Sequence, residues 1–161
     1  MATDTTTKLL QNAEKYVLDG KIPQAIAEYS KVLDLNPRNV LVLTTIGHLY
    51  LRLHNISEAN KYLIQVAEGY DRNKFFLKAI AVYKQILNAD ANNLGINLAL
   101  ASLYAKQGLS IDSLNQYLRV ATLLEQHGKN KELMSVYEKI AELDPSNSEA
   151  KRKLAELHLE V

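Results

Sequence analysis

The sequence repeats itself every 54 residues, and this repeat limits the folds open to the chain more than any other feature. A shift of 54 superposes identical residues of all three copies at four positions: Ala13, Ala67 and Ala121; Tyr29, Tyr83 and Tyr137; Asn39, Asn93 and Asn147; Leu49, Leu103 and Leu157. Three copies fill the chain of 161 residues. A period of about this length is typical of repeat proteins, in which each unit buries its apolar face against the next.

Each copy contains three stretches with the periodicity of an amphipathic helix. Apolar residues recur at three- and four-residue steps, as in Ile26, Tyr29 and Leu33. Residues typical of helix ends separate the stretches, namely Gly20, Gly108, Gly128, Pro37 and Pro145. We therefore predict nine helices, over residues 5–18, 22–35, 40–53, 56–72, 75–89, 94–107, 110–127, 130–143 and 148–160. Because the connections are short, consecutive helices should be antiparallel neighbours.

The composition excludes several classes of function. With 19 basic and 18 acidic residues the formal charge is +1, so binding to nucleic acid or to an anionic membrane surface has no electrostatic support. The absence of cysteine excludes disulfides and thiolate metal sites. Polar residues interrupt every apolar run, and the first residues lack the pattern of a secretory signal. We predict a soluble, cytoplasmic protein without a membrane span.

The repeated residues resemble the tetratricopeptide repeat, a helix–turn–helix unit of 34 residues with the pattern W-x2-L-G-x2-Y, A-x3-F and P. Residues 6–39 fit this pattern with Leu9, Ala13, Tyr16, Gly20, Ala25, Tyr29 and Pro37. Similar matches suggest repeats over 40–66, 60–93, 94–121 and 114–147, with a terminal half-repeat over 148–161. The resemblance implies an all-α fold: a single solenoid domain over 1–161, built from three units of 54 residues with three helices each.

The repeat starts alternate in spacing, so two of the predicted helices belong to two repeats each. The helices over 56–72 and 110–127 fit both the second-helix pattern of one repeat and the first-helix pattern of the next. Such a helix should carry apolar residues on two faces, because it packs on neighbours before and behind it. The aligned alanines Ala13, Ala67 and Ala121 should be fully buried at close helix contacts.

No residue pattern points to catalysis, to a metal or to a cofactor. The four histidines at 48, 54, 127 and 158 lie in no ligand motif, and the nucleotide-binding and nucleophile motifs are absent. Some tetratricopeptide repeats clamp a chaperone's terminal carboxylate with Lys, Asn and Arg, but the matching positions hold Leu10, Glu14, Thr44 and His48. We expect no enzyme, no cofactor and no such clamp.

The resemblance implies a non-enzymatic scaffold or adaptor that binds a peptide or a helical segment of a partner protein. The alternative is a self-associating structural or assembly module, or a chaperone-like repeat protein of a secretion or motility system. In either case the expected partner is a protein, with weak self-association as a further expectation. Nucleic acid and membrane insertion are not expected.

Seven residues are candidates for partner contact. The positions beside the core of the first-type helices hold Thr44, His48, Arg52, Ser102 and Lys106. Phe75 aligns with Lys21 and Lys129, which predicts that it faces solvent together with Leu77, whereas Phe76 packs inward. An exposed aromatic residue beside a leucine is typical of an interface. The other interpretation is a local staple, in which Phe75 folds back towards Tyr70 or Arg72.

Overall fold

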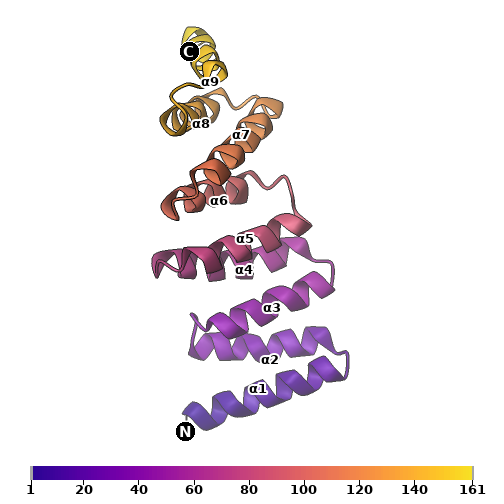
Figure 1. The fold of residues 1–161 in the computed structure, drawn as a ribbon. Helices are drawn as coiled ribbons and strands as arrows, with labels where there is room; N and C mark the ends of the chain where they lie inside the picture. Colours follow the sequence, from indigo (N-terminus) through magenta and orange to yellow (C-terminus); the bar gives the residue numbers. More distant parts are fainter. Residues whose placement is uncertain (1, 161) are drawn as a thin grey trace. The chain divides into compact units, whose positions relative to one another are not determined.

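A computed structural model describes residues 2–160, and these residues form nine α-helices and no β-strand (Figure 1). The helices are α1 (Ala2–Leu18), α2 (Ile22–Leu35), α3 (Val40–Arg52), α4 (Ile56–Arg72), α5 (Phe76–Ala89), α6 (Leu94–Lys106), α7 (Ser110–Gln126), α8 (Asn130–Leu143) and α9 (Ser148–Glu160). The prediction of an all-α helical-repeat fold is confirmed. The observed helix ends lie within one residue of the predicted ones, except that α1 begins at Ala2 rather than at residue 5. Residues 1 and 161 of the predicted domain lie outside the described residues.

The helix lengths recur along the chain in the order 17, 14 and 13 residues. The aligned asparagines explain one of the recurring helix starts. Asn39 Oδ1 accepts a hydrogen bond from the Val42 amide at 3.2 Å, and Asn93 Oδ1 accepts one from the Ile96 amide at 3.1 Å. A side-chain oxygen at this place satisfies an amide that the helix itself leaves without a partner.

A second recurring feature is a left-handed residue in the turns that follow α1, α3, α4, α6 and α7. Gly20, Gly108 and Gly128 have φ values of 72°, 81° and 64°, a region in which glycine carries no steric penalty. The aligned positions of the other turns hold His54 at φ 56° and Lys74 at φ 61°. The backbone turn is therefore kept even where the residue type disfavours it.

The chain divides into two compact units, the first ending at Asn73 and the second beginning at Lys74. In the first unit, α1 to α4 follow one another in antiparallel order, and each packs on the next (Figure 1). One cluster of buried side chains holds α1, α2 and α3 together: Ala13, Ile22, Ala25, Ile26, Tyr29, Val32, Val42, Ile46 and Leu49. The prediction of one solenoid domain over the entire chain stays a prediction.

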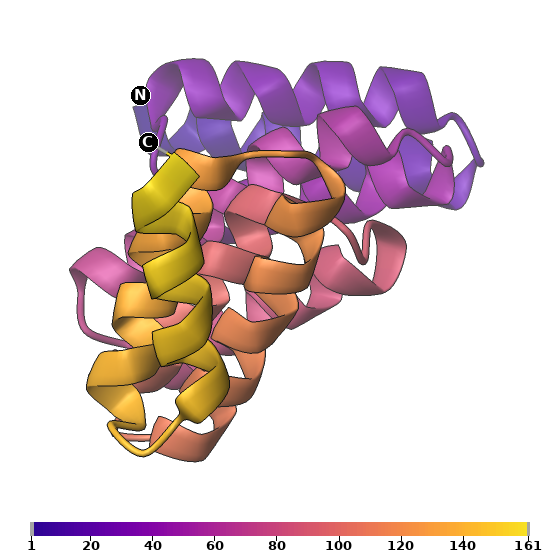
Figure 2. The ribbon, with the colours of Figure 1, turned by 90° about the horizontal axis from the view of Figure 1, so that it is seen from above.

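The second unit contains α5 to α9, and each helix again packs on its successor in the chain. Figure 2 shows this unit with α9 in front of α8. Its main cluster of buried side chains draws on α6, α7, α8 and α9: Ala101, Tyr117, Val120, Ala121, Leu124, Leu133, Val136, Tyr137, Ile140, Ala150 and Leu157. Helix α7 packs on both α6 and α8, as predicted for the helix over 110–127.

Small residues mark the close contacts between helices. Ala13 and Ala67 are 0% exposed and Ala121 is 2% exposed, which confirms the burial predicted for these aligned alanines. Gly47 of α3 lies so close to α4 that a Cβ atom placed on it would be 2.7 Å from the side chain of Leu63. The spacing between these two helices therefore depends on the missing side chain at position 47.

Candidate partner-binding groove

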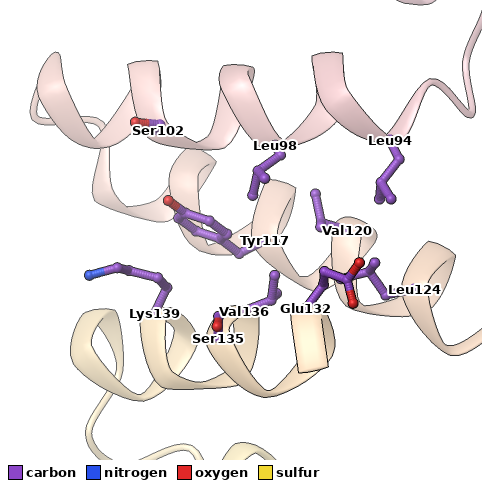
Figure 3. Close-up of a pocket in the computed structure, with 10 residues that line it drawn as sticks. All are labelled: Leu94, Leu98, Ser102, Tyr117, Val120, Leu124, Glu132, Ser135, Val136 and Lys139. Atoms are coloured by element: carbon purple, nitrogen blue, oxygen red, sulfur yellow. The ribbon is translucent and has the colours of Figure 1, made fainter. Parts of the chain in front are cut away.

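A groove of about 440 Å³ lies on the second unit, with α7 as its floor and with α6 and α8 as its walls (Figure 3). The groove is lined by Leu94, Leu98, Ser102, Tyr117, Val120, Leu124, Glu132, Ser135, Val136 and Lys139. Six of these ten side chains are apolar or aromatic. The groove is therefore a concave, mostly apolar surface with a few polar groups, which is the usual character of a binding site.

The spacing of the lining residues explains how three helices make one groove. Leu94 and Leu98 are four residues apart on α6, so they face the same side of that helix. Tyr117, Val120 and Leu124 form the corresponding stripe on α7. Because α7 packs on α6 and on α8 through different faces, the stripe between those faces remains at the bottom of the groove.

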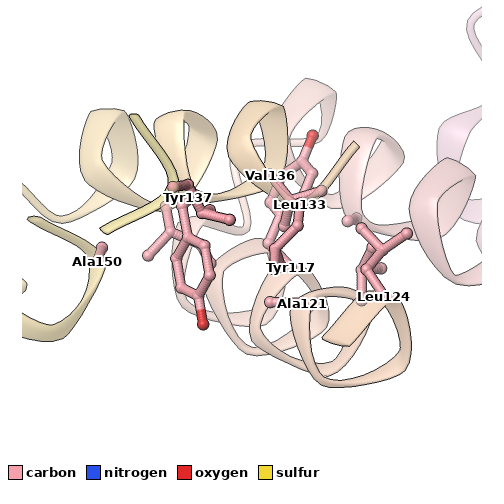
Figure 4. Close-up of a cluster of buried hydrophobic side chains, with 11 residues drawn as sticks. Tyr117, Ala121, Leu124, Leu133, Val136, Tyr137 and Ala150 are labelled. Atoms are coloured by element: carbon pink, nitrogen blue, oxygen red, sulfur yellow. The ribbon is translucent and has the colours of Figure 1, made fainter. Parts of the chain in front are cut away.

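The floor of the groove is rigid because its residues also belong to the buried core. Tyr117 and Leu124 of the floor pack in the cluster that joins α6 to α9, and Val136 of the wall formed by α8 packs in the same cluster (Figure 4). Leu98 is different, since 42% of it is exposed on the wall formed by α6. Such an exposed leucine beside a packed floor offers apolar surface to a partner without a change in the core.

The wall formed by α8 carries two opposite charges. Glu132 and Lys139 are seven residues apart, which is about 10 Å along a helix. A hydrogen bond from the Lys139 ammonium to Glu142, at 2.7 Å, raises the pKa of Lys139. Burial raises the pKa of Tyr117 above its ordinary value of 10.0. The groove thus combines an apolar floor with one acidic and one basic group on the same wall.

The first unit contains three of the predicted contact residues, all on α3. Thr44 is half-buried, and its hydroxyl donates a hydrogen bond to the Val40 carbonyl at 2.7 Å. His48 and Arg52 are exposed. Thr44 therefore has a local role in the helix, whereas His48 and Arg52 present polar groups to solvent.

The second unit contains the other four predicted contact residues. Ser102 is half-buried and lines the groove. Lys106, at the end of α6, places its ammonium 5.9 Å from the centre of the Phe76 ring.

The two remaining residues lie at the start of α5. Phe75 is 55% exposed and Leu77 is 63% exposed, as the sequence predicts, while Phe76 is half-buried. The Lys78 ammonium lies 5.2 Å from the centre of the Phe75 ring. The structure thus brings Lys106 to the start of α5, where the exposed Phe75 and Leu77 lie, and places Ser102 in the groove.

Most of the groove residues are not among the predicted contact residues. Leu94 and Leu98 lie on a helix that carries apolar residues on nearly every face, so the pattern alone does not separate groove residues from core residues. The apolar residues on nearly every face of α6 were the available signal for a binding surface. A helix with two neighbouring helices cannot bury apolar residues on all of its faces, so some of them must remain exposed. Leu98 aligns with Thr44, which the sequence analysis did select. The contribution of α8, including Val136 and Lys139, had no signal in the sequence.

The fold and the groove define an all-α helical-repeat protein. A family model described as TPR repeat matches residues 13–53, from the middle of α1 to just past α3. This segment is therefore similar to a tetratricopeptide repeat, which confirms the predicted resemblance there. Tetratricopeptide repeats commonly mediate protein–protein interaction and are generally not enzymes.

Several solved structures are similar to this chain. A structure titled MamA protein has 17% identity, covers 96% of this chain and 91% of that chain, and gives a TM-score of 0.49. A structure of repeats from a putative kinesin light chain of Podosopora anserina has 13% identity and a TM-score of 0.49. The match covers 95% of this chain and 92% of that chain. A structure of the first TPR of Spaghetti bound to an HSP90 peptide has 19% identity and a TM-score of 0.36. The match covers 98% of this chain and 95% of that chain. A comparison with curated proteins finds no match.

Within residues 2–160, no helix is both long enough and apolar enough to cross a membrane. In the same residues, no group of three or more His, Asp or Glu side chains is arranged to hold a metal ion. The cytoplasmic location expected from the sequence stays a prediction.

Proposed function

We propose that this protein is a non-enzymatic scaffold that binds a peptide or a helical segment of a partner protein in the groove of α6, α7 and α8. The observation that carries this proposal is the groove itself, an apolar surface of about 440 Å³ with the exposed Leu98 on its wall. Residues 13–53 supply independent support, because tetratricopeptide repeats are commonly interaction modules.

The groove suggests the chemistry of its partner. An amphipathic helix that enters such a groove anchors it with apolar residues at i, i+3 or i+4, and i+7. Burial of one leucine-sized side chain contributes about 1.5–3 kcal/mol. A basic residue of the partner near Glu132 and an acidic one near Lys139 would match the two charges on α8 and would fix the direction of the bound segment.

A photo-crosslinking experiment tests this proposal. A benzophenone amino acid is placed at Leu98 in the groove and, as a matched control, at Ile111, which is 77% exposed and lies outside the groove lining. Cells of the source organism that express each variant are irradiated. We expect a partner protein to be captured from position 98 only, and Leu98→Asp to abolish its binding while Ile111→Asp does not. Equal capture from both positions, or binding that survives Leu98→Asp, would contradict the proposal.

Self-association is the second candidate function, and a specific surface favours it. Phe75 and Leu77 at the start of α5 are exposed, and Lys106 adds a cation beside Phe76. Sedimentation velocity at micromolar concentrations should show a dimer that Phe75→Ala weakens without a change in melting temperature. A monomer at these concentrations would remove this candidate. A lower melting temperature of Phe75→Ala would instead support the local staple.

A further inference from the structure

A second pocket, of about 280 Å³, lies on the second unit between α5, α6 and α7. It is lined by Lys84, Leu87, Asn88, Ala91, Asn97, Leu100, Tyr104, Gln116 and Arg119. It shares no lining residue with the groove of α6, α7 and α8. Unlike the groove, this pocket has polar or charged side chains at five of its nine lining residues, including two cations and no carboxylate.

A network of hydrogen bonds builds one wall of this pocket. Asn97 is 0% exposed, and its Nδ2 donates to the carbonyls of Ala91 at 3.1 Å and Asn93 at 2.8 Å. Gln116 Nε2 donates to Asn97 Oδ1 at 2.6 Å. The guanidinium of Arg119 donates through Nη2 to the Ala91 carbonyl at 3.0 Å. The network satisfies the buried amide and fixes the direction of Arg119 at the same time.

The first unit shows that this network is not required by the fold. Asn97 aligns with Leu43, which is buried, and Gln116 aligns with Tyr62. The Tyr62 ring stacks on Tyr50 with centroids 5.7 Å apart and packs against the core of the first unit. The same helix arrangement thus holds an aromatic stack in one unit and a polar pocket in the other.

The charges of the two units differ in the same direction. Ser30, Asp34 and Gln65 of the first unit correspond to Lys84, Asn88 and Arg119 of the second unit. The second unit therefore has two cations in place of neutral residues, and a neutral amide in place of the carboxylate. Among the described residues 2–160, no carboxylate lies within ion-pair distance of Lys84 or Arg119. All the differences make this pocket more favourable for an anion.

We propose that the pocket of α5, α6 and α7 binds the carboxylate of an acidic side chain from a partner protein. Arg119 has further N–H groups that can meet a carboxylate in its plane, and Lys84 adds a second positive charge. The amides of Asn88 and Gln116 supply neutral donors. This site goes beyond the proposed groove and does not depend on it.

Nuclear magnetic resonance of the full chain tests this site directly. The side-chain amide signals of Asn97 and Gln116 are followed while the peptide acetyl-Ala-Ala-Glu-Ala-Ala-amide is added. We expect saturable shifts of both signals with a dissociation constant on the order of 1–10 mM, and no shifts with the Gln analogue of the peptide. The double variant Lys84→Ser, Arg119→Gln introduces the residues that the first unit has at these positions, and it should lose the shifts. Its circular dichroism should match that of the parent protein.

Three comparisons can overturn the assignment. The first comparison is a control variant that moves the two cations to the first unit. It combines Lys84→Ser and Arg119→Gln with Ser30→Lys and Gln65→Arg, so that the cations lie at the aligned positions, where Tyr62 occupies the space of the pocket. If this combined variant binds the Glu peptide as well as the parent does, charge alone is sufficient and the pocket is not a site. Equal binding of the Gln analogue would also overturn it. The assignment would also be overturned if the Glu peptide did not bind while inorganic phosphate, or a peptide whose only carboxylate is its free terminus, gave saturable shifts.

Discussion

The two units of this protein use one pattern of helices for different surfaces. In the first unit Gly47 faces Leu63, whereas the aligned positions of the second unit hold Ala101 and Tyr117. The first unit also stacks Tyr62 on Tyr50 where the second has a polar pocket. The helix lengths, the asparagine caps of α3 and α6, and the left-handed turns recur in both. The comparison shows that the repeated residues set the backbone, while the residues that vary between copies determine what each unit can bind.

The largest expected effect tests the alanine contacts that both units share. Ala67→Leu inserts three carbon atoms at a fully buried contact and should lower the free energy of unfolding by about 1–3 kcal/mol. Urea unfolding measures this loss. The control is Ala27→Leu, which makes the same change at an exposed position of α2 and should have little effect. If Ala67→Leu and Ala27→Leu had the same stability, the assigned contact would be wrong.

A second test concerns the close approach of α3 and α4. Gly47→Ala should lower the free energy of unfolding by about 1–2 kcal/mol, because the new Cβ would meet Leu63, which is 0% exposed. Gly69→Ala is the matched control, since its nearest neighbour would be the end of Arg72 at 3.7 Å. That change should stabilise α4 by about 0.5–1 kcal/mol through helix propensity. A stabilising Gly47→Ala would show that the second unit's alanine fits both units equally well.

Exchange of the turn residues between the units gives a smaller effect. His54 and Gly108 occupy the same repeat position, and both have positive φ. His54→Gly should raise the free energy of unfolding by about 0.5–1 kcal/mol, and Gly108→His should lower it by a similar amount. Thermal and urea unfolding of both variants provide the measurement. Effects of the same sign in the two variants would contradict the shared turn geometry.

The smallest expected effect belongs to a contact network of the second unit. Glu125 of α7 accepts hydrogen bonds from Lys153 of α9 at 2.8 Å and from the Tyr137 hydroxyl of α8 at 3.1 Å. The hydrogen bond from Lys153 holds the pKa of Glu125 below its ordinary value of 4.5. The folded state therefore gains stability above the ordinary pKa and loses it as the pH falls through the lowered value.

The variant Glu125→Gln isolates this contribution. Because the pair is partly exposed, the stabilisation at neutral pH should be below about 1 kcal/mol. We expect the unfolding free energy of Glu125→Gln to fall less than that of the parent protein when the pH is lowered from about 6 to about 3. These two pH values lie on either side of the ordinary carboxylate pKa. Parallel pH profiles of the two proteins would exclude a role of Glu125 in linking α7, α8 and α9.

The sequence was sufficient to predict the helices and their turns, because period and end signals act locally. Asn39 and Asn93 cap helices through the adjacent turn, and Gly108 and Gly128 end helices by their own backbone conformation. Burial of Ala67 followed from its alignment with two other alanines. These inferences need no knowledge of how distant helices meet.

The binding surfaces were less predictable, because they depend on contacts between helices. Leu98 is apolar like its neighbours on α6, and only the packing of α7 and α8 shows that it lies in a groove. Likewise, Asn97 and Gln116 are 19 residues apart, and their hydrogen bond depends on how α6 packs on α7. Ser102 was predicted as a partner-contact residue from its position beside the core, and only the structure places it in a groove. Lys84 and Arg119 are indistinguishable in the sequence from ordinary surface cations.

The packing of each helix on its neighbours in the chain also bears on how the protein folds. Within each unit, the closely packed helix pairs of the described residues are consecutive in sequence. Proteins with such local contacts close short loops and fold quickly, because little chain entropy is lost before a contact forms. A pair such as α6 and α7 can therefore serve as a nucleus to which later helices add one at a time. Amide exchange should accordingly be slowest in pairs with neighbours on both sides and fastest towards the chain ends.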